Sequence, residues 1–114
     1  MGFFRTEKTE SEYEAEASKY LLDGEKIIKA SKNWNGWVCI TDKRLMYVDI
    51  DRDSSIKTVD KFTTIPLSAI IEIRWSVADT LGFLDISTSK RTHELKVGAG
   101  SVKIFADTLM NQIL

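Results

Sequence analysis

Residues 71–77 alternate apolar and polar side chains without a break. The apolar set is Ile71, Ile73, Trp75 and Val77, and the polar set is Glu72, Arg74 and Ser76. Successive side chains of a β-strand point to opposite faces, so every apolar residue of this segment falls on one face. The same alternation recurs around Leu84 and Ile86 and around Leu95 and Val97. We predict three antiparallel strands here, the first of them half-buried.

The pattern changes from strand to helix after Gly98 and Gly100. The apolar residues are then offset by three, four, seven, eight and eleven positions, and they are Val102, Phe105, Ala106, Leu109, Met110 and Ile113. This spacing is typical of one face of an amphipathic helix, and Ser101 is placed as its N-cap. We therefore predict a closing helix that covers one end of the sheet structure.

The N-terminal segment also carries a helical pattern. Thr9 and Glu12 have capping-box spacing, and the helix they begin is predicted near residues 10–22. Its apolar face consists of Tyr13, Ala17, Tyr20 and Leu21. Asp23 and Gly24 end this helix, because glycine accepts the left-handed conformation that is common after a helix end.

The middle of the chain has strand composition. We predict strands over residues 25–31, 37–41, 45–50 and 58–65, with a hairpin turn at Asn35-Gly36 and a polar loop over 51–57. Pro66 ends the last of these strands, because proline lacks the N–H that a central ladder position needs. Cys39 lies within the second segment, between Val38 and Ile40, and is predicted as a core or opposite-face residue.

These elements together predict a mainly β (α+β) fold. About seven antiparallel strands form a split barrel, a C-terminal helix caps it, and an extra N-terminal helix precedes it. We divide the chain into an acidic helical arm over residues 1–22 and a β domain over 23–114. Residues 1–25 carry seven acidic and three basic residues, against ten acidic and thirteen basic residues over 26–114.

Composition excludes several functional classes. The 114 residues carry a formal net charge of -1, so the chain lacks the excess of positive charge that is typical of a general nucleic-acid binder. The only histidine is His93, on a strand pattern, where a structural role is expected rather than catalysis. Cys39 has no second cysteine for zinc spacing or a disulfide, and no apolar run approaches the roughly 20 residues that span a bilayer. We expect a cytoplasmic protein that is not an enzyme and has no cofactor.

One acidic run has partial metal-ligand spacing. Asp49, Asp51 and Asp53 stand at alternate positions, as the first ligands of an EF-hand loop do. Ser54 replaces the glycine that such a loop needs at its sixth position, and Asp60 is shorter than the glutamate expected at its twelfth. The run is a weak calcium candidate, and a solvated hairpin loop is the alternative.

Three motifs in order resemble those of the bacterial pleckstrin-homology-like (bacterial PH) domain family. They are L-D-G-E at residues 22–25, I-T-D-K-R-L at 40–45, a variant of the family's T-N-K-R-L, and I-P-L-S-A-I at 65–70. The likeness spans about residues 20–114 and leaves the N-terminal helix outside. It implies the fold but no activity. Because related bacterial domains assemble as homo-oligomers, it also implies protein association as the function, with another protein as the alternative partner.

Two sets of residues are candidates for contacts. Tyr13, Ala17, Tyr20 and Leu21 must be covered either by their own domain or by a neighbour, and a neighbour would mean oligomerisation. The alternative function is peripheral membrane or anionic-ligand binding through the first hairpin, on the inner face of the membrane. The residues for that function are Lys29, Lys32, Trp34 and Arg44. Lys29 and Lys32 are three positions apart, so they point to opposite faces of a strand.

Overall fold

The computed structural model describes residues 10–51 and 59–114. Thr9 of the predicted capping box and most of the predicted polar loop lie outside these ranges. In chain order, the elements of the described residues are α1 (Glu10–Ala17), η1 (Ser18–Tyr20), β1 (Ile27–Asn33), β2 (Gly36–Thr41), β3 (Arg44–Asp51), β4 (Val59–Pro66), η2 (Leu67–Ala69), β5 (Glu72–Ala78), β6 (Leu81–Ser87), β7 (Thr92–Gly98) and α2 (Val102–Ile113). The predicted mainly β fold with two flanking helices is confirmed.

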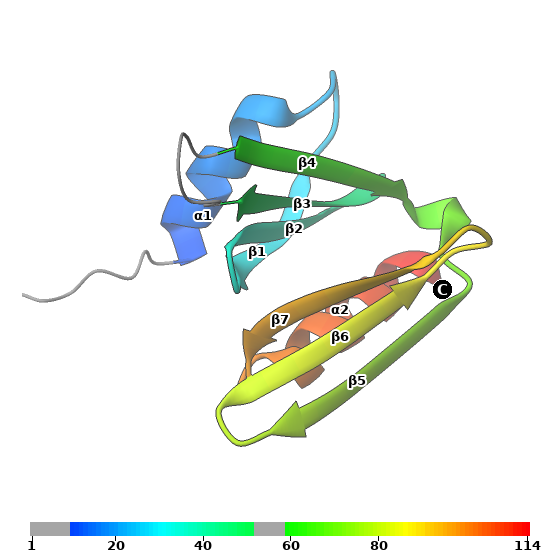
Figure 1. Ribbon diagram of the computed structural model, residues 1–114. Helices are drawn as coiled ribbons and strands as arrows, with labels where there is room; N and C mark the ends of the chain where they lie inside the picture. The colour runs from blue at the N-terminus through cyan, green and yellow to red at the C-terminus, as the bar shows by residue number, and fades with distance from the viewer. Residues whose placement is uncertain (1–9, 52–58) are drawn as a thin grey trace, which may run out of the picture.

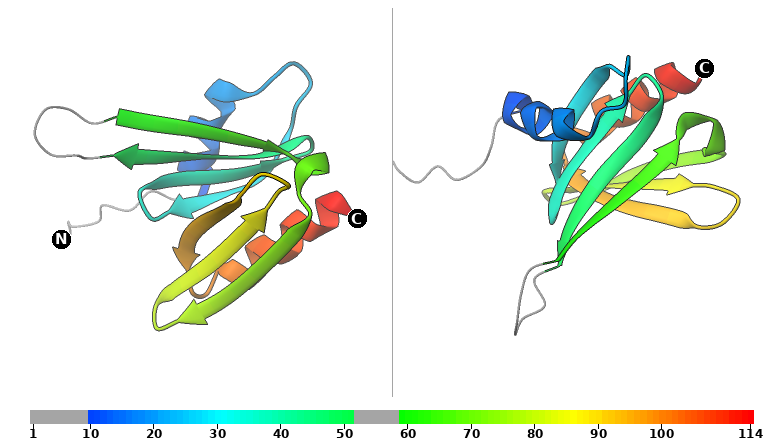
Figure 2. Two further views of the ribbon diagram at one scale, coloured as in Figure 1. Left: turned by 45° about the vertical axis from the view of Figure 1, so that its right-hand side comes forward. Right: turned by 90° about the horizontal axis from the view of Figure 1, so that it is seen from above.

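The strands form two antiparallel meanders, β1-β2-β3-β4 and β5-β6-β7. Figure 1 shows the two sheets above one another, with α1 beside the first and α2 along the second. The views in Figure 2 show the same arrangement, with the two helices on separate parts of the surface. Each sheet has two edge strands, and β1 and β7 are joined by the hydrogen bond from the N–H of Trp34 to the Lys96 carbonyl, so the open edges of the split barrel are at β4 and β5.

The first hairpin turns one residue earlier than the Asn35-Gly36 signal predicts. Trp34 and Asn35 form the turn, and Gly36 is already the first residue of β2. A Cβ on Gly36 would come within 1.9 Å of the carbonyl oxygen of Val48. Glycine is thus required here by the close approach of β2 to the backbone of β3.

The main core lies between the two sheets and α2. Its buried side chains come from β2, β3, β4, β6, β7 and α2, and they are Val38, Ile40, Leu45, Tyr47, Ile65, Leu84, Ile86, Leu95, Val97, Val102, Phe105, Ala106 and Leu109. Gly82 lets α2 approach, because a Cβ there would lie 2.5 Å from Cβ of Val102. Met110, predicted on the buried face of α2, is instead exposed at the margin of that face.

A second core covers the opposite face of the first sheet. It joins α1 to β1, β2 and β3 through Tyr13, Ala17, Ala30, Trp37, Cys39, Met46 and Val48. Because β2 is covered on both faces, Trp37–Thr41 is buried throughout instead of alternating. The prediction that Cys39 is a core or opposite-face residue is confirmed, because it lies in this second core.

A strand is present where the alternation at residues 71–77 predicts one, but its apolar side chains are more exposed than predicted. Ile71 precedes the strand and is exposed, Ile73 packs against the main core, and the side chains of Trp75 and Val77 are 44% and 48% exposed. An edge strand has a neighbour on one side only, so its side chains are covered on one flank only. The half-buried prediction is therefore wrong for Trp75 and Val77.

Candidate interaction surfaces

The most apolar exposed strand is the edge strand β5. Trp75 lies opposite Leu84 and Val77 lies opposite Gly82 in the register with β6. Directly opposed residues of an antiparallel pair point to the same face, so Trp75 and Val77 extend the core-facing side of the sheet beyond its covered part. We name Ile71, Trp75 and Val77, with the unpaired backbone edge of Glu72–Ala78, the β5 edge.

The edge of the other sheet carries an aromatic stack. Tyr20 stacks on Phe62 of β4 at a ring-centroid distance of 4.9 Å and an interplanar angle of 21°. Tyr20 also lies 5.7 Å from the ring of Trp37. Tyr20 and Phe62 are both partly exposed, whereas Trp37 is buried beneath them. The stack attaches the end of the N-terminal helical segment to the outer side of β4.

The helix residues expected to serve assembly lie mostly against the chain's own sheet. Tyr13 and Ala17 are buried in the second core, and Leu21 is partly buried against it. Tyr20 is exposed on one side of its aromatic stack. The structure thus covers the apolar face of α1 within one chain, which is the first of the two alternatives considered for this helix.

Three of the four predicted ligand-contact residues come together at one cavity. Lys29 and Lys32 of β1 and Trp34 of the following turn line a cavity of about 540 Å³. The two lysines do point to opposite faces, as their spacing predicts, because Lys29 lies opposite Ile40 of the main core and Lys32 lies opposite Trp37 of the second core. Both nevertheless line the one cavity, which lies beside β1 where that strand meets β7.

The same cavity contains residues that sequence reasoning missed. They are Tyr13, Ala30, Ser31, Thr80, Leu81, Lys96, Val97, Gly98 and Ser101. Lys96 comes from β7. Two hydrogen bonds join this strand to the end of β1. The N–H of Trp34 donates to the Lys96 carbonyl at 2.8 Å, and the N–H of Lys96 donates to Oδ1 of Asn33 at 3.0 Å. The only signal for Asn33 was its polar side chain beside a turn, which does not indicate a distant partner.

Arg44, the fourth predicted contact residue, lies outside this cavity in an ion pair with Glu25. Its Nε donates to Oε2 of Glu25 at 2.9 Å, and its Nη2 donates to the carbonyl of Tyr20 at 2.6 Å. Burial by itself would raise the pKa of Glu25, but the Arg44 guanidinium, the Leu22 amide and the Thr41 hydroxyl lower it from 4.5 to about 2. The geometry gives Arg44 a structural role, holding the end of the N-terminal helical segment to β3.

The turn that contains Arg44 is organised by one hydroxyl group. Oγ1 of Thr41 accepts hydrogen bonds from the N–H groups of Lys43 at 3.1 Å and Arg44 at 3.0 Å, and it donates to Oε2 of Glu25. Asp42 accepts a further bond from the N–H of Lys26 at 3.0 Å. These are the backbone bonds expected of a threonine and an aspartate at a tight turn.

His93 and Cys39 have surroundings typical of structural residues. Nδ1 of His93 is hydrogen-bonded to the Tyr47 hydroxyl at 2.8 Å, and burial, with the nearby positive charge of Arg91, lowers the pKa of the imidazole. Burial, with the negative charge of Glu25, raises the pKa of the Cys39 thiol to about 12, so the thiolate is scarce at neutral pH. Neither side chain has the arrangement of a catalytic base or nucleophile.

The calcium candidate falls largely outside the described residues. Asp49 is half-buried and accepts a hydrogen bond from Nδ2 of Asn33 at 3.2 Å. Asp51 is the last residue of β3, and Asp53 lies outside the described ranges. Over residues 10–51 and 59–114, no three His, Cys, Asp or Glu side chains gather as a metal ion requires. In the same ranges, neither helix is long and apolar enough to cross a bilayer.

Comparisons with known proteins agree on one fold. A crystal structure of a DUF1696-family protein with a pleckstrin-homology domain, from Shewanella loihica PV-4, is similar to this chain at 21% identity and a TM-score of 0.70. The match covers 94% of this chain and 95% of the Shewanella loihica chain. A crystal structure of a pleckstrin-homology domain from Shewanella amazonensis SB2B is similar at 23% identity and a TM-score of 0.72. The match covers 96% of this chain and 92% of that chain.

Among curated proteins, no match to the sequence is found. The family model described as "Bacterial PH domain" matches residues 2–109, so the match includes α1, which the sequence resemblance left outside. This match extends over most of the chain and agrees with the two-sheet architecture and the closing helix. The chain therefore belongs to the bacterial PH domain family.

Proposed function

We propose that this chain is a noncatalytic interaction module that associates with further copies of itself, and that the β5 edge is the contact. The observation that carries the proposal is the exposure of Trp75 and Val77 on a strand that has a hydrogen-bonded neighbour on one side only. An open strand edge offers unpaired N–H and C=O groups, and large apolar side chains beside it add area that association removes from water.

The composition of β5 supports pairing with another strand. Natural monomers block open edges with lysine, proline or a bulge, which make strand addition unfavourable. Residues 72–78 contain neither lysine nor proline, and their register with β6 is regular from end to end. The charged residues Glu72 and Arg74 lie in the first half of the strand, and residues 75–78 carry no charge.

A second copy is a suitable occupant because one chain offers two open edges of similar length. β4 is the outer strand of the first sheet with eight residues, and β5 is the outer strand of the second with seven. Contact between two β5 edges would close at a dimer, whereas contact of β5 with the β4 of a neighbour would continue from copy to copy, as a ring or as an open filament. The solution mass distinguishes these two arrangements.

The experiment is light scattering over a range of concentrations on the full chain and two variants. Val77→Lys places a charge on the β5 edge, and Ser89→Lys places the same charge at the exposed β6–β7 turn as a matched control. We expect an oligomer for the unmodified chain and for Ser89→Lys, and a monomer for Val77→Lys. A monomer at every concentration for the unmodified chain would overturn the proposal, as would equal masses for both variants.

We also place this module in the cytoplasm. The support is the single cysteine, Cys39, which is a buried free thiol within the second core. A reducing compartment keeps such thiols unpaired.

A further inference from the structure

A buried side-chain hydrogen bond joins the two sheets near the β6–β7 turn. The Tyr47 hydroxyl of β3 and Nδ1 of His93 of β7 lie 2.8 Å apart, and both side chains are buried. Their rings also pack edge to face, at a centroid distance of 5.9 Å and an interplanar angle of 78°. Because β3 and β7 belong to different sheets, this contact holds one sheet against the other.

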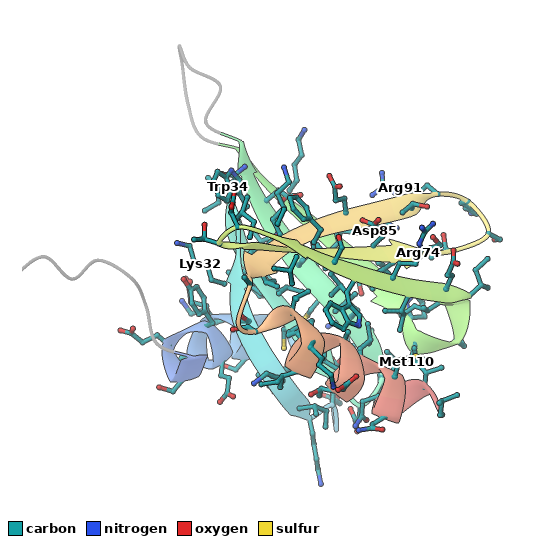
Figure 3. All side chains as sticks on the ribbon, turned by 90° about the horizontal axis from the view of Figure 1, so that it is seen from below. Lys32, Trp34, Arg74, Asp85, Arg91 and Met110 are labelled. Carbon is teal, nitrogen blue, oxygen red and sulfur yellow. The ribbon has the colours of Figure 1, made fainter. Side chains whose placement is uncertain are left out.

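Arg91 places a permanent positive charge against the same imidazole. Its Nε donates to Nε2 of His93 at 3.4 Å, and its Nη2 lies 3.2 Å from Nδ1. The backbone of Arg91 closes the β6–β7 turn, because its carbonyl accepts a hydrogen bond from the N–H of Thr88 at 2.9 Å. Figure 3 shows Arg91 at this turn, on the other side of the molecule from Lys32 and Trp34. Arg91 is exposed, so its side chain can move into solvent without crossing the core.

The contact between Arg91 and His93 depends on a neutral imidazole. A neutral ring has one acceptor nitrogen, whereas a protonated ring has two N–H donors and no acceptor. A proton on His93 therefore removes every hydrogen bond that the guanidinium can donate to the ring, and it brings a second positive charge against the first. A buried charge without a counter-charge is unfavourable, so the imidazolium is stabilised by reaching water.

No carboxylate of the described residues is hydrogen-bonded to His93. Asp85 and Glu94 lie opposite each other in the β6–β7 pair, and each is the sequence neighbour of an inward-facing residue. Successive strand residues point to opposite faces, so these two carboxylates are on the outer face. Asp49 of β3 lies opposite Lys61 of β4, a residue of opposite charge. The described residues thus provide no counter-charge in contact with a protonated His93.

We propose that protonation of His93 displaces Arg91 and separates the two sheets at the β6–β7 turn, while the rest of the fold stays intact. The separation is local because the sheets remain joined elsewhere, where the N–H of Trp34 donates to the Lys96 carbonyl. The open form exposes the imidazole to water and binds the proton more strongly than the closed form, so acid favours it. This device is separate from the β5 edge and does not depend on self-association.

The first test is a pH titration of the full chain followed by NMR. His93 is the only histidine of the 114 residues, so the imidazole signals report this residue alone. We expect these signals to titrate below the ordinary pKa of 6.5, because burial and the charge of Arg91 oppose the proton. Nuclear Overhauser effects between the Tyr47 and His93 rings should disappear in the same transition. The amide signals of β2 should keep their folded positions, because this buried strand is not part of the junction.

Three variants assign the transition to the proposed groups. Arg91→Gln removes the positive charge beside the imidazole and should move the transition to higher pH. Lys90→Gln makes the same charge change at the neighbouring exposed position of the turn and should leave the transition unchanged. His93→Gln stays neutral at every pH, so the Tyr47 signals of this variant should not change over the range in which those of the unmodified chain do.

Hydrogen exchange distinguishes local separation from unfolding. The N–H of Thr88 is a suitable probe, because its hydrogen bond to the Arg91 carbonyl closes the turn. At one pH unit below 6.5, its protection, corrected for the intrinsic effect of pH, should fall by up to about tenfold. Low urea should leave this exchange unchanged while it accelerates the exchange of β2, because complete unfolding exposes much more surface.

Four results would overturn the proposal. The first is a titration of His93 at or above pH 6.5, and the second is persistence of the Tyr47–His93 ring contacts after His93 is protonated. The third is an equal effect of Lys90→Gln and Arg91→Gln on the transition. The fourth is a change of the β2 signals together with those of His93, because acid would then unfold the whole chain.

Discussion

Trp75 and Leu84 lie directly opposite each other in the β5–β6 pair, yet Leu84 is fully buried and Trp75 is 44% exposed. Both side chains point to the same face, so the difference comes from the position of the strands in the sheet. β6 has a neighbour on each side, whereas β5 has β6 alone. The β5 edge is therefore apolar surface that the fold of a single chain leaves uncovered.

Substitution of these two residues should separate association from stability. Leu84→Ala should lower the free energy of unfolding by about 2–5 kcal/mol, because it leaves a cavity in the main core. Trp75→Lys should cost less, about 1 kcal/mol, because the indole is only partly covered, and it should abolish association. Urea unfolding of dilute samples and light scattering measure the two effects. A larger loss of stability for Trp75→Lys than for Leu84→Ala would show that the indole belongs to the core.

The ion pair between Glu25 and Arg44 should make the protein sensitive to acid. The pKa of Glu25 is lowered from 4.5 to about 2, so its stabilisation is complete above pH 4.5 and is lost as the pH falls towards 2. Glu25→Gln should lower the free energy of unfolding at neutral pH by about 1–3 kcal/mol and flatten its dependence on pH in that window. Urea midpoints across the window measure both.

The exposed ion pair between Lys103 and Asp107 provides the control for this prediction. Its N–O distance is 2.7 Å, but both side chains are mostly in solvent. Asp107→Asn should change the free energy of unfolding by less than about 1 kcal/mol. Equal effects of Glu25→Gln and Asp107→Asn would refute the structural role assigned to the buried pair.

His93 should make the protein less stable below neutral pH. Burial, with the positive charge of Arg91, lowers the pKa of His93 from its ordinary value of 6.5, so the unfolded chain binds the proton more strongly. The free energy of unfolding therefore falls as the pH decreases through 6.5 towards the lowered pKa of the folded state. His93→Gln should remove this part of the pH dependence, measured as urea midpoints at about pH 7.5 and about pH 5.5. An unchanged slope in the variant would assign the effect to other groups.

The thiol of Cys39 should resist alkylation in the native protein. Burial, with the charge of Glu25, raises its pKa to about 12, and the side chain lies between α1 and the first sheet. Iodoacetamide should therefore modify Cys39 completely after unfolding and only slowly before it, which mass spectrometry measures. Rapid modification of the native chain would mean that α1 leaves the sheet readily.

The sequence predicted the elements well because their patterns are local. The 3.6-residue spacing of Val102, Phe105 and Leu109 placed α2, and the alternation at 71–77 placed β5. Burial was harder to predict because it depends on neighbours in space. Met110 and Trp75 fit the buried face of their elements by spacing, but they lie at the margins of the covered area.

The cavity was predictable only in part for the same reason. Lys29, Lys32 and Trp34 were found from one stretch of sequence, whereas Lys96 reaches them through the hydrogen bond between its N–H and Asn33, 63 residues away in the chain. A polar residue beside a turn does not specify such a partner. Arg44 shows the opposite case: it was grouped with the first hairpin, but it lies at the β2–β3 turn and binds Glu25 and Tyr20 instead of lining the cavity.

Hydrogen exchange of the β5 amides at low and high protein concentration tests the proposed contact most directly. If another copy pairs with the β5 edge, the outward N–H groups of Glu72–Ala78 should exchange more slowly as the concentration rises, and Val77→Lys should remove this protection. Exchange of β5 that is the same at every concentration, or protection that appears only in other elements such as α1, would contradict the account.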